Sequence, residues 1–208
     1  MHFKIIKKDT KTRARVGEIT LNGRKFETPI FMPVATSAAI KGLHTKDLVE
    51  SSNAEIILAN TYHLYLRPGD QIIKNCGGIH DFMSWDKLVL TDSGGYQVYS
   101  LSNNRKIKED GVKFKSHIDG SYHFFSPEKA IQIQKNIGAD IIMAFDECTP
   151  YPCTQDYARK SMNLTHRWLK RCISEFENTD KNRSREQFLF PIIQGSIYGD
   201  LRTESAEF

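Results

Sequence analysis

Four polar side chains each follow a short apolar run, and together they could form a site for a planar ligand that makes hydrogen bonds. They are Asn60, Asp92, Asp146 and Gln194. Carboxylates accept hydrogen bonds and can transfer protons, whereas an amide both donates and accepts. If the apolar runs are parallel strands, the polar residues at their carboxyl ends meet at one mouth. Each residue alone is better explained as a helix N-cap, but the four together favour a site.

The most specific stretch is TDSGGYQV, residues 91–98. Gly94 and Gly95 allow backbone amides to approach a ligand closely, because neither carries a Cβ atom. Tyr96 offers a flat ring on which a base could stack. A phosphate-binding loop is disfavoured, since no Lys-Ser or Lys-Thr pair follows the glycines.

The elements that would position these residues alternate between strands and helices. The apolar runs are continuous, as in strands that are buried on both faces of a parallel sheet, and comprise Ile56–Ala59, Leu88–Thr91, Ile141–Phe145 and Phe188–Ile193. An earlier run, Ile30–Val34, is expected to supply the first strand, although Pro33 weakens that prediction. Helices are expected from Ser126-Pro127 to Gly138 and from Asp156 to Phe176.

Antiparallel pieces accompany this pattern. Residues 1–30 are expected to form antiparallel strands, with a turn at Asn22-Gly23 between the runs Phe3–Lys8, Val16–Leu21 and Lys25–Phe31. Asp119-Gly120 predicts an inserted hairpin near residues 112–125, between Val112–Ile118 and Tyr122–Phe125. We therefore expect an α/β fold in a single domain, 1–208, in which residues 31–208 supply the first βα units.

Composition narrows the class of protein. The chain is 39% hydrophobic and 11% aromatic, as in globular proteins, and its net charge of +4 mildly favours an anionic partner. Four scattered cysteines show no zinc spacing, so no metal ligand is predicted. With no signal-peptide h-region and no long apolar stretch, we expect a cytoplasmic protein with reduced thiols that does not enter a membrane.

Five motifs resemble those of the bacterial-type tRNA-guanine transglycosylases, also called queuine tRNA-ribosyltransferases, and they occur in the family's order. They are TPIFMPVAT (28–36), LANTYHLYLRPG (58–69), LTDSGGYQVYSL (90–101), AFDEC (144–148) and PIIQG (191–195). The resemblance is to the N-terminal part of the family's fold. That fold is an irregular (β/α)8 TIM barrel with an N-terminal antiparallel sheet, so the barrel is expected to be incomplete in this chain.

The resemblance implies base exchange at the tRNA wobble position. A carboxylate attacks the ribose anomeric carbon, guanine leaves and 7-aminomethyl-7-deazaguanine replaces it in queuosine biosynthesis. Asp92 resembles the family's catalytic acid/base, Asp146 the carboxylate that binds the donor edge of guanine, and Gln194 the amide that reads the base carbonyl. Tyr96 resembles the stacking platform. The pocket neighbours implied are Ser93, Gly94 and Gly95, with Asn60 and Cys148 as secondary candidates.

Other family features have no counterpart here. The resemblance implies a nucleophilic aspartate, a zinc site with a C-x-C-x-x-C and a His, and most of the tRNA surface, all downstream of the last motif. No organic cofactor is implied. The implied partners are tRNA with guanine at the wobble position and the deazaguanine base, and the resemblance also allows a homodimer. Only about five βα units are counted where a barrel has eight. Because no residue here is assigned as the nucleophile or as a zinc ligand, we expect the 208-residue chain alone to be inactive.

Two other functions stay open. The chain could be a non-catalytic truncated remnant that binds a purine base or pairs with another subunit, or a different barrel enzyme that acts on a small nucleoside. His63 is expected to pack or hydrogen-bond near the barrel mouth. One helix presents a basic face that is expected to be solvated, formed by Arg159, Lys160, Arg167, Lys170 and Arg171.

Overall fold

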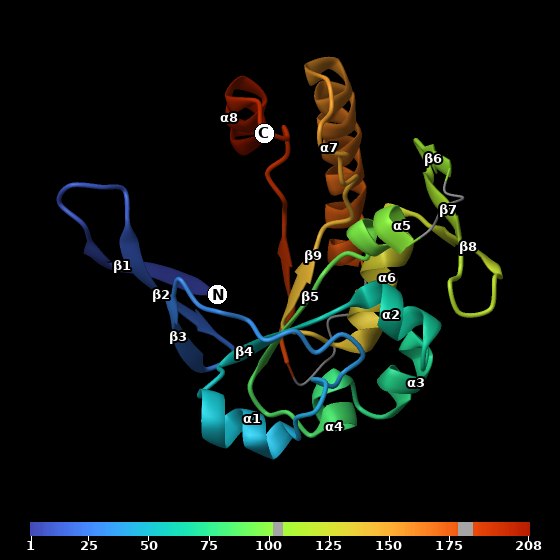
Figure 1. The fold of residues 1–208 in the computed structure, drawn as a ribbon. Helices are drawn as coiled ribbons and strands as arrows, with labels where there is room; N and C mark the ends of the chain where they lie inside the picture. Colours follow the sequence, from blue (N-terminus) through green and yellow to red (C-terminus); the bar gives the residue numbers. More distant parts are fainter. Residues whose placement is uncertain (102–105, 179–184) are drawn as a thin grey trace.

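The central feature of this computed structural model, which describes residues 1–101, 106–178 and 185–208, is a four-stranded parallel sheet (Figure 1). The strands lie in the order β10-β9-β5-β4. Their bounds are β4 Ile56–Ala59, β5 Leu88–Thr91, β9 Ile141–Met143 and β10 Phe188–Phe190. The four parallel strands therefore lie side by side in the order in which they occur along the chain, which is the arrangement that βαβ units produce. The mixed α/β class predicted from the alternating pattern is confirmed.

The two faces of this sheet bury different side chains, because successive residues of a strand point to opposite sides. The face toward the helices buries Ile57, Val89 and Ile142. The opposite face buries the alternate residues Ile56, Leu88 and Ile141. Both faces are apolar, which explains why the sequence shows continuous apolar runs here. On the second face several side chains are only partly buried, namely Leu90, Met143, Phe188 and Phe190.

Two long helices cover the first face, and both were predicted. α6 spans Pro127–Ile137: Ser126 Oγ accepts a hydrogen bond from the Lys129 amide at 3.1 Å, and Gly138 ends the helix with φ 81°. α7 spans Gln155–Asn178. The other helices are α1 Thr45–Ser52, α2 Thr61–Leu66, α3 Asp70–Asn75, α4 Ile79–Met83, α5 Gly95–Leu101 and α8 Gly199–Glu207. Among the described residues, no helix combines the length and apolar character needed to cross a membrane.

An antiparallel sheet at the N-terminus closes part of the second face. It consists of β1 His2–Lys8, β2 Arg15–Leu21 and β3 Arg24–Thr28, in that order. The predicted turn is present, with Asn22 at φ 48° and Gly23 at φ 75°. Leu21 and Phe26 pack in the same apolar cluster as the parallel strands. The prediction of antiparallel strands within residues 1–30 is confirmed.

The inserted hairpin is one strand larger than predicted. β7 Gly111–Lys115 pairs with β8 Tyr122–Phe125, and β6 Lys106–Lys108 adds a third antiparallel strand. The predicted strand 112–118 ends at Lys115, because the backbone then turns and the Gly120 amide donates to the Ser116 carbonyl at 3.0 Å. β6 has too few apolar residues to be recognised by alternation.

Prolines account for most of the other differences in strand length. The predicted strand Ile30–Val34 is reduced to a single parallel bridge between Val34 and Leu58, since Pro33 has no N–H to donate. For the same reason β3 ends at Thr28, before Pro29, and β10 ends at Phe190, before Pro191. β9 also ends at Met143, earlier than predicted.

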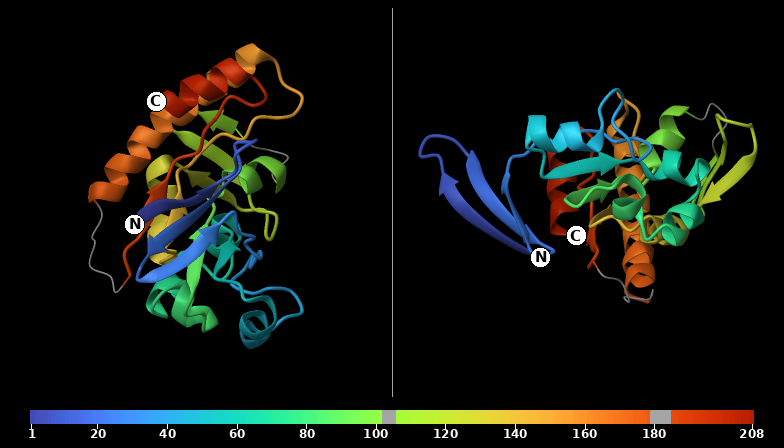
Figure 2. Two further views of the ribbon diagram at one scale, coloured as in Figure 1. Left: turned by 90° about the vertical axis from the view of Figure 1, so that its left-hand side faces the viewer. Right: turned by 90° about the horizontal axis from the view of Figure 1, so that it is seen from below.

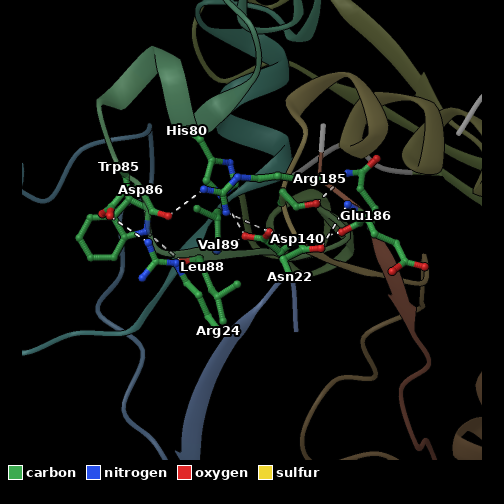
Figure 3. Close-up of polar contacts among 12 residues, drawn as sticks. Asn22, Arg24, His80, Trp85, Asp86, Leu88, Val89, Asp140, Arg185 and Glu186 are labelled. Atoms are coloured by element: carbon green, nitrogen blue, oxygen red, sulfur yellow. Dashed lines mark hydrogen bonds and ion pairs between the residues drawn. The ribbon is translucent and has the colours of Figure 1, made fainter. Parts of the chain in front are cut away.

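A buried carboxylate joins the N-terminal sheet to the amino ends of the parallel strands (Figure 3). Asp140 precedes β9 and accepts hydrogen bonds from the Val89 amide at 2.9 Å and Asn22 Nδ2 at 2.6 Å. His80 Nε2 lies 2.9 Å and Arg185 Nη1 lies 3.4 Å from its oxygens. Burial raises the pKa of Asp140, but its hydrogen bonds and the charge of His80 outweigh burial and lower it. The amino ends of the strands are therefore fixed from several elements.

Candidate functional site

Asp92 follows β5, and donors from the neighbouring strand end hold its carboxylate. The register of β4 and β5 sets Asn60 and Thr61 beside Asp92. Asn60 Nδ2 donates to Oδ2, while the Thr61 amide donates to Oδ1 at 3.0 Å. The Gly94 amide donates to the same Oδ1, also at 3.0 Å. All three contacts come from donors, so each favours the ionised form of Asp92.

Asp146 lies shortly after β9 and links two further segments. Ser93 Oγ donates to its Oδ1 at 3.0 Å, and Gln194 Nε2 donates to its Oδ2 at 3.1 Å. Ser93 follows Asp92 directly, so the two carboxylates belong to one hydrogen-bonded cluster. The structure thus brings Asn60, Asp92, Asp146 and Gln194 together at the carboxyl ends of the parallel strands.

Gly95 allows α5 to start directly against Asp146. A Cβ atom at position 95 would lie 2.5 Å from the Asp146 carbonyl oxygen and 3.0 Å from its Oδ1. Gly94 has φ +83°, a conformation that residues with a side chain rarely adopt. The two glycines therefore set the backbone at this site.

Burial dominates the electrostatics of both carboxylates. It raises the pKa of Asp92, and the hydrogen bonds from Asn60, Thr61 and Gly94 only partly oppose it. Burial also raises the pKa of Asp146, and the nearby charge of Asp92 raises it further. Two neighbouring carboxylates with raised pKa values are more easily protonated than ordinary ones, which is what proton transfer at neutral pH requires.

A small cavity of about 10 Å³, room for about one water molecule, adjoins Asp146. Gly95 and Cys148 are among its lining residues. Tyr96 lies outside this lining, and its side chain is 60% exposed. A larger groove of about 580 Å³ runs beside β10 and the end of α7, and none of the predicted site residues lines it.

Comparison with known proteins identifies the family. A family model described as "Queuine tRNA-ribosyltransferase" matches residues 9–208. Queuine tRNA-ribosyltransferases from Caldanaerobacter subterraneus and Acetivibrio thermocellus are 56% and 54% identical to this chain, each over 99% of it. The one from Symbiobacterium thermophilum is 52% identical over 100% of the chain.

The chain belongs to the queuine tRNA-ribosyltransferase family. The resemblance drawn from the five motifs is confirmed, and the matched residues include every predicted site residue. The chain spans about half the length of the curated relatives it matches, with 53%, 54% and 50% of these three covered.

Two residues of this queuine tRNA-ribosyltransferase family member contact Asp92 without having been predicted. Thr61 donates through its backbone amide, which no side-chain pattern signals, although its place beside Asn60 follows from the strand register. The Gln97 side chain lies close enough to Asp92 to lower its pKa, while Gln97 Oε1 is buried and has no hydrogen-bond partner within the described residues. Gln97 lies two residues after Gly95 on α5, and its approach to Asp92 depends on how that helix packs against the strand ends.

His63 lies near the same cluster, as predicted. Its ring contacts those of Tyr62 and His117 at centroid distances of 5.3 and 5.5 Å. Burial and the neighbouring His117 lower the pKa of His63, whereas the charge of Asp92 opposes them. His63 is therefore close enough to Asp92 for the two to interact electrostatically.

The zinc site implied by the queuine tRNA-ribosyltransferase resemblance does not fit the described part of the chain. Across residues 1–101, 106–178 and 185–208, no three His, Cys, Asp or Glu side chains gather as metal ligands would. Cys148 contacts the carbonyl oxygen of Thr149 at 3.8 Å, and none of the four cysteines forms a disulfide. No chemical step is therefore assigned to zinc in this chain.

Proposed function

We propose that this chain carries the base-binding part of a tRNA-guanine transglycosylase, which exchanges guanine at the wobble position for 7-aminomethyl-7-deazaguanine. The observation that carries the proposal is the position of Asp146, held between Ser93 and Gln194 beside Asp92. This cluster pairs a carboxylate acceptor with an amide, as a purine with a mixed donor and acceptor edge requires. The names of the relatives give the substrate class as tRNA.

Base recognition would proceed by exchange of hydrogen bonds at Asp146. Gln194 Nε2 occupies Asp146 Oδ2 in the free chain, at the place where an N–H donor of guanine would bind. A bound base that donates to Asp146 would release Gln194, whose amide could then read the base carbonyl. The adjoining cavity of about 10 Å³ is smaller than a purine, so the base would also have to displace neighbouring side chains. Tyr96, largely exposed, would stack on the bound base.

Asp92 would move the proton. Guanine leaves more easily when it is protonated, and the incoming base must lose a proton, so an acid/base of raised pKa is required. Retention of configuration also requires a nucleophile that holds the ribosyl group between the two steps. The resemblance assigns that role downstream of the last motif, and Asp92 cannot easily serve both purposes. We therefore propose that the 208-residue chain alone is inactive.

The fold proposed for this function is a (β/α)8 barrel, of which this chain supplies consecutive strands in one domain. Two observations support it. The parallel strands occur in sequence order, and Val34 continues that order by bridging to Leu58 of β4. The sheet face opposite the helices is apolar but only partly buried, as the inner face of a barrel would be before further strands close it.

Calorimetry with guanine and with 7-aminomethyl-7-deazaguanine tests base binding by the chain. Asp146→Asn replaces one acceptor with a donor, so we expect binding to weaken by about 2–5 kcal/mol. Asp156→Asn, a change at an exposed carboxylate on α7, is the control and should leave affinity unchanged. Equal affinities for the two variants would show that Asp146 does not bind the base.

Incorporation of radiolabelled guanine into tRNA tests the assignment of the nucleophile. We expect the purified 208-residue chain to give no incorporation above background. Turnover that is abolished by Asp92→Ala would show that the chain is a sufficient enzyme and that the nucleophile lies within it.

A further inference from the structure

The positive charge of the chain is concentrated on one hairpin. We call β1, β2 and the turn between them, residues 2–21, the basic hairpin. Its residues up to position 15 hold six cations and a single acid, Asp9, whereas the whole chain has a net charge of only +4. The rest of the chain is therefore slightly acidic. The six cations are Lys4, Lys7, Lys8, Lys11, Arg13 and Arg15.

These cations are available to a partner. All residues from 1 to 15 are exposed, and the turn of the hairpin extends away from the rest of the molecule in both Figure 1 and the right-hand view of Figure 2. Within the ranges that the structure describes, none of the six takes part in an ion pair. The basic hairpin is thus a solvent-exposed array of unneutralised charge.

The single acid of this segment is used by the turn itself. Asp9 Oδ2 accepts hydrogen bonds from the Thr12 amide at 2.7 Å, the Thr12 hydroxyl at 2.7 Å and the Lys11 amide at 3.2 Å. These contacts, the Thr12 hydroxyl first, lower the pKa of Asp9. The carboxylate therefore orders the turn and does not pair with the lysines and arginines around it.

The arrangement has a cost for stability that a structural role does not explain. Lys8 and Arg15 are directly opposite each other in the register of β1 and β2. Like charges in that position destabilise an antiparallel pair. A bound anion would convert this repulsion into attraction, because both cations could contact it from the same end of the hairpin.

The basic face of α7 differs in this respect. Arg159, Arg167 and Arg171 form ion pairs with Glu204, Glu109 and Glu128 at 2.7, 2.7 and 2.6 Å. The three arginine side chains remain solvated, as predicted, with 44%, 53% and 33% of each exposed, and acids from α8, the β6–β7 turn and α6 also neutralise them. The three arginines of α7 are therefore paired with acids, whereas none of the six cations of the basic hairpin is paired within the described residues.

We propose that the basic hairpin binds the phosphate backbone of the tRNA substrate, away from the base-binding cluster. The proposal rests on the proposed function, which supplies RNA as the polyanion. A ribbon of two strands with cations at its end can follow a phosphate backbone without reading sequence. Phe3 covers Gly17 of the neighbouring strand, because a Cβ there would lie 2.3 Å from the Phe3 ring. Phe3 is nevertheless 45% exposed, so the test below includes anionic vesicles to distinguish RNA from a membrane surface.

The test measures binding of a fluorescent anticodon stem–loop to the chain by anisotropy, as a function of salt concentration. The hairpin variant carries Lys7→Gln, Lys8→Gln, Lys11→Gln and Arg13→Gln. A control variant with the same net charge carries four exposed substitutions elsewhere, Lys41→Gln, Lys74→Gln, Lys160→Gln and Lys170→Gln. A third variant, Lys7→Arg, Lys8→Arg and Lys11→Arg, keeps the charge. Circular dichroism melts check that each variant folds.

We expect the hairpin variant to bind RNA at least about tenfold more weakly at low salt. In a plot of the logarithm of the binding constant against the logarithm of the salt concentration, its slope should be smaller in magnitude by about 3. The control and arginine variants should bind like the unmodified chain. Stem–loops with guanine or adenine at the wobble position should respond equally, because phosphate contacts carry no sequence information.

Equal weakening of the hairpin and control variants would overturn the proposal, since only net charge would then matter. Binding to anionic phospholipid vesicles together with no binding to RNA would also overturn it. The test does not depend on base binding. If calorimetry shows no guanine binding but RNA binding still depends on the hairpin, the proposed function is refuted and the hairpin proposal stands.

Discussion

Gly95→Ala is the change that most directly tests how the site is built. A Cβ at position 95 would lie 2.5 Å from the Asp146 carbonyl oxygen, whereas ordinary van der Waals contact begins at 3.4 Å. The neighbour is backbone, which cannot swing away, so α5 or the Asp146 segment must shift. Overpacking of this kind costs about 1–3 kcal/mol.

The control is Gly199→Ala, because Gly199 is also the first residue of a helix, but a Cβ there would meet no described atom within 4 Å. The free energy of unfolding should rise there by about 0.4–1 kcal/mol, since alanine restricts the unfolded chain. Alanine restricts the unfolded chain in the same way at position 95. The free energies of unfolding of the two variants should therefore differ by about 1–3 kcal/mol, which is the cost of the contact with Asp146.

Urea unfolding followed by circular dichroism gives the free energy of unfolding of both variants. In thermal melts, their melting temperatures should differ by about 2–4 °C per kcal/mol at this chain length. Because the shift also moves Asp146 relative to Ser93 and Gln194, guanine binding should weaken in Gly95→Ala and stay unchanged in Gly199→Ala. Two variants of equal stability and equal guanine affinity would refute the view that Gly95 is required by the approach of α5 to Asp146.

Four further outcomes are expected. Asp140→Ala should lower the free energy of unfolding by about 3–5 kcal/mol, because it removes one partner of a buried charged network, and a loss below about 1 kcal/mol would contradict that role. Since the pKa of Asp140 is lowered, its stabilisation is present above the ordinary carboxyl pKa and is lost as pH falls through the lowered value, so Asp140→Asn should flatten the acid side of the stability profile. The pKa values of Asp92 and Asp146 are raised, so stability should decline as pH rises from the ordinary carboxyl pKa through the raised values, and the double variant Asp92→Asn, Asp146→Asn should remove that decline in urea titrations at several pH values. A thiol reagent should modify exposed Cys76 in the native chain, whereas buried Cys172, whose pKa is raised to about 12, should react only after unfolding.

The fold was predictable where local signals were strong. The Ser126 cap and Gly138 bounded α6 almost to the residue, and Asn22-Gly23 located a turn, because each signal acts within a few residues. The short helices α1 to α5 were not predicted, because each has eight residues or fewer and shows too few turns for a helical periodicity. The third strand β6 is held by its pairing with β7, which no local pattern reveals.

The site was predictable in its side chains but not in its backbone. Polar residues that end apolar runs pointed to Asn60, Asp92 and Asp146. Gln194 was placed directly after a strand, whereas the strand ends at Phe190 and a loop carries Gln194 to Asp146. The Thr61 amide and the buried Gln97 Oε1 were missed, since both depend on tertiary geometry. The catalytic and binding roles of these residues remain predictions for the assays above.

The Asp140 network also bears on how the chain reaches its fold. Asn22 and Asp140 are 118 positions apart in the sequence, and Arg185 is 45 positions beyond Asp140. Contacts of such long range require large loops to close before they contribute, which slows folding and favours a late, concerted step. Asp140 is buried where these segments pack together, so it gains all its hydrogen-bond partners only after every one of them has folded into place. The N-terminal sheet and the parallel sheet should therefore dock in a single late folding step. During refolding, protection from hydrogen exchange at the β2–β3 turn and at β5 should appear at the same time.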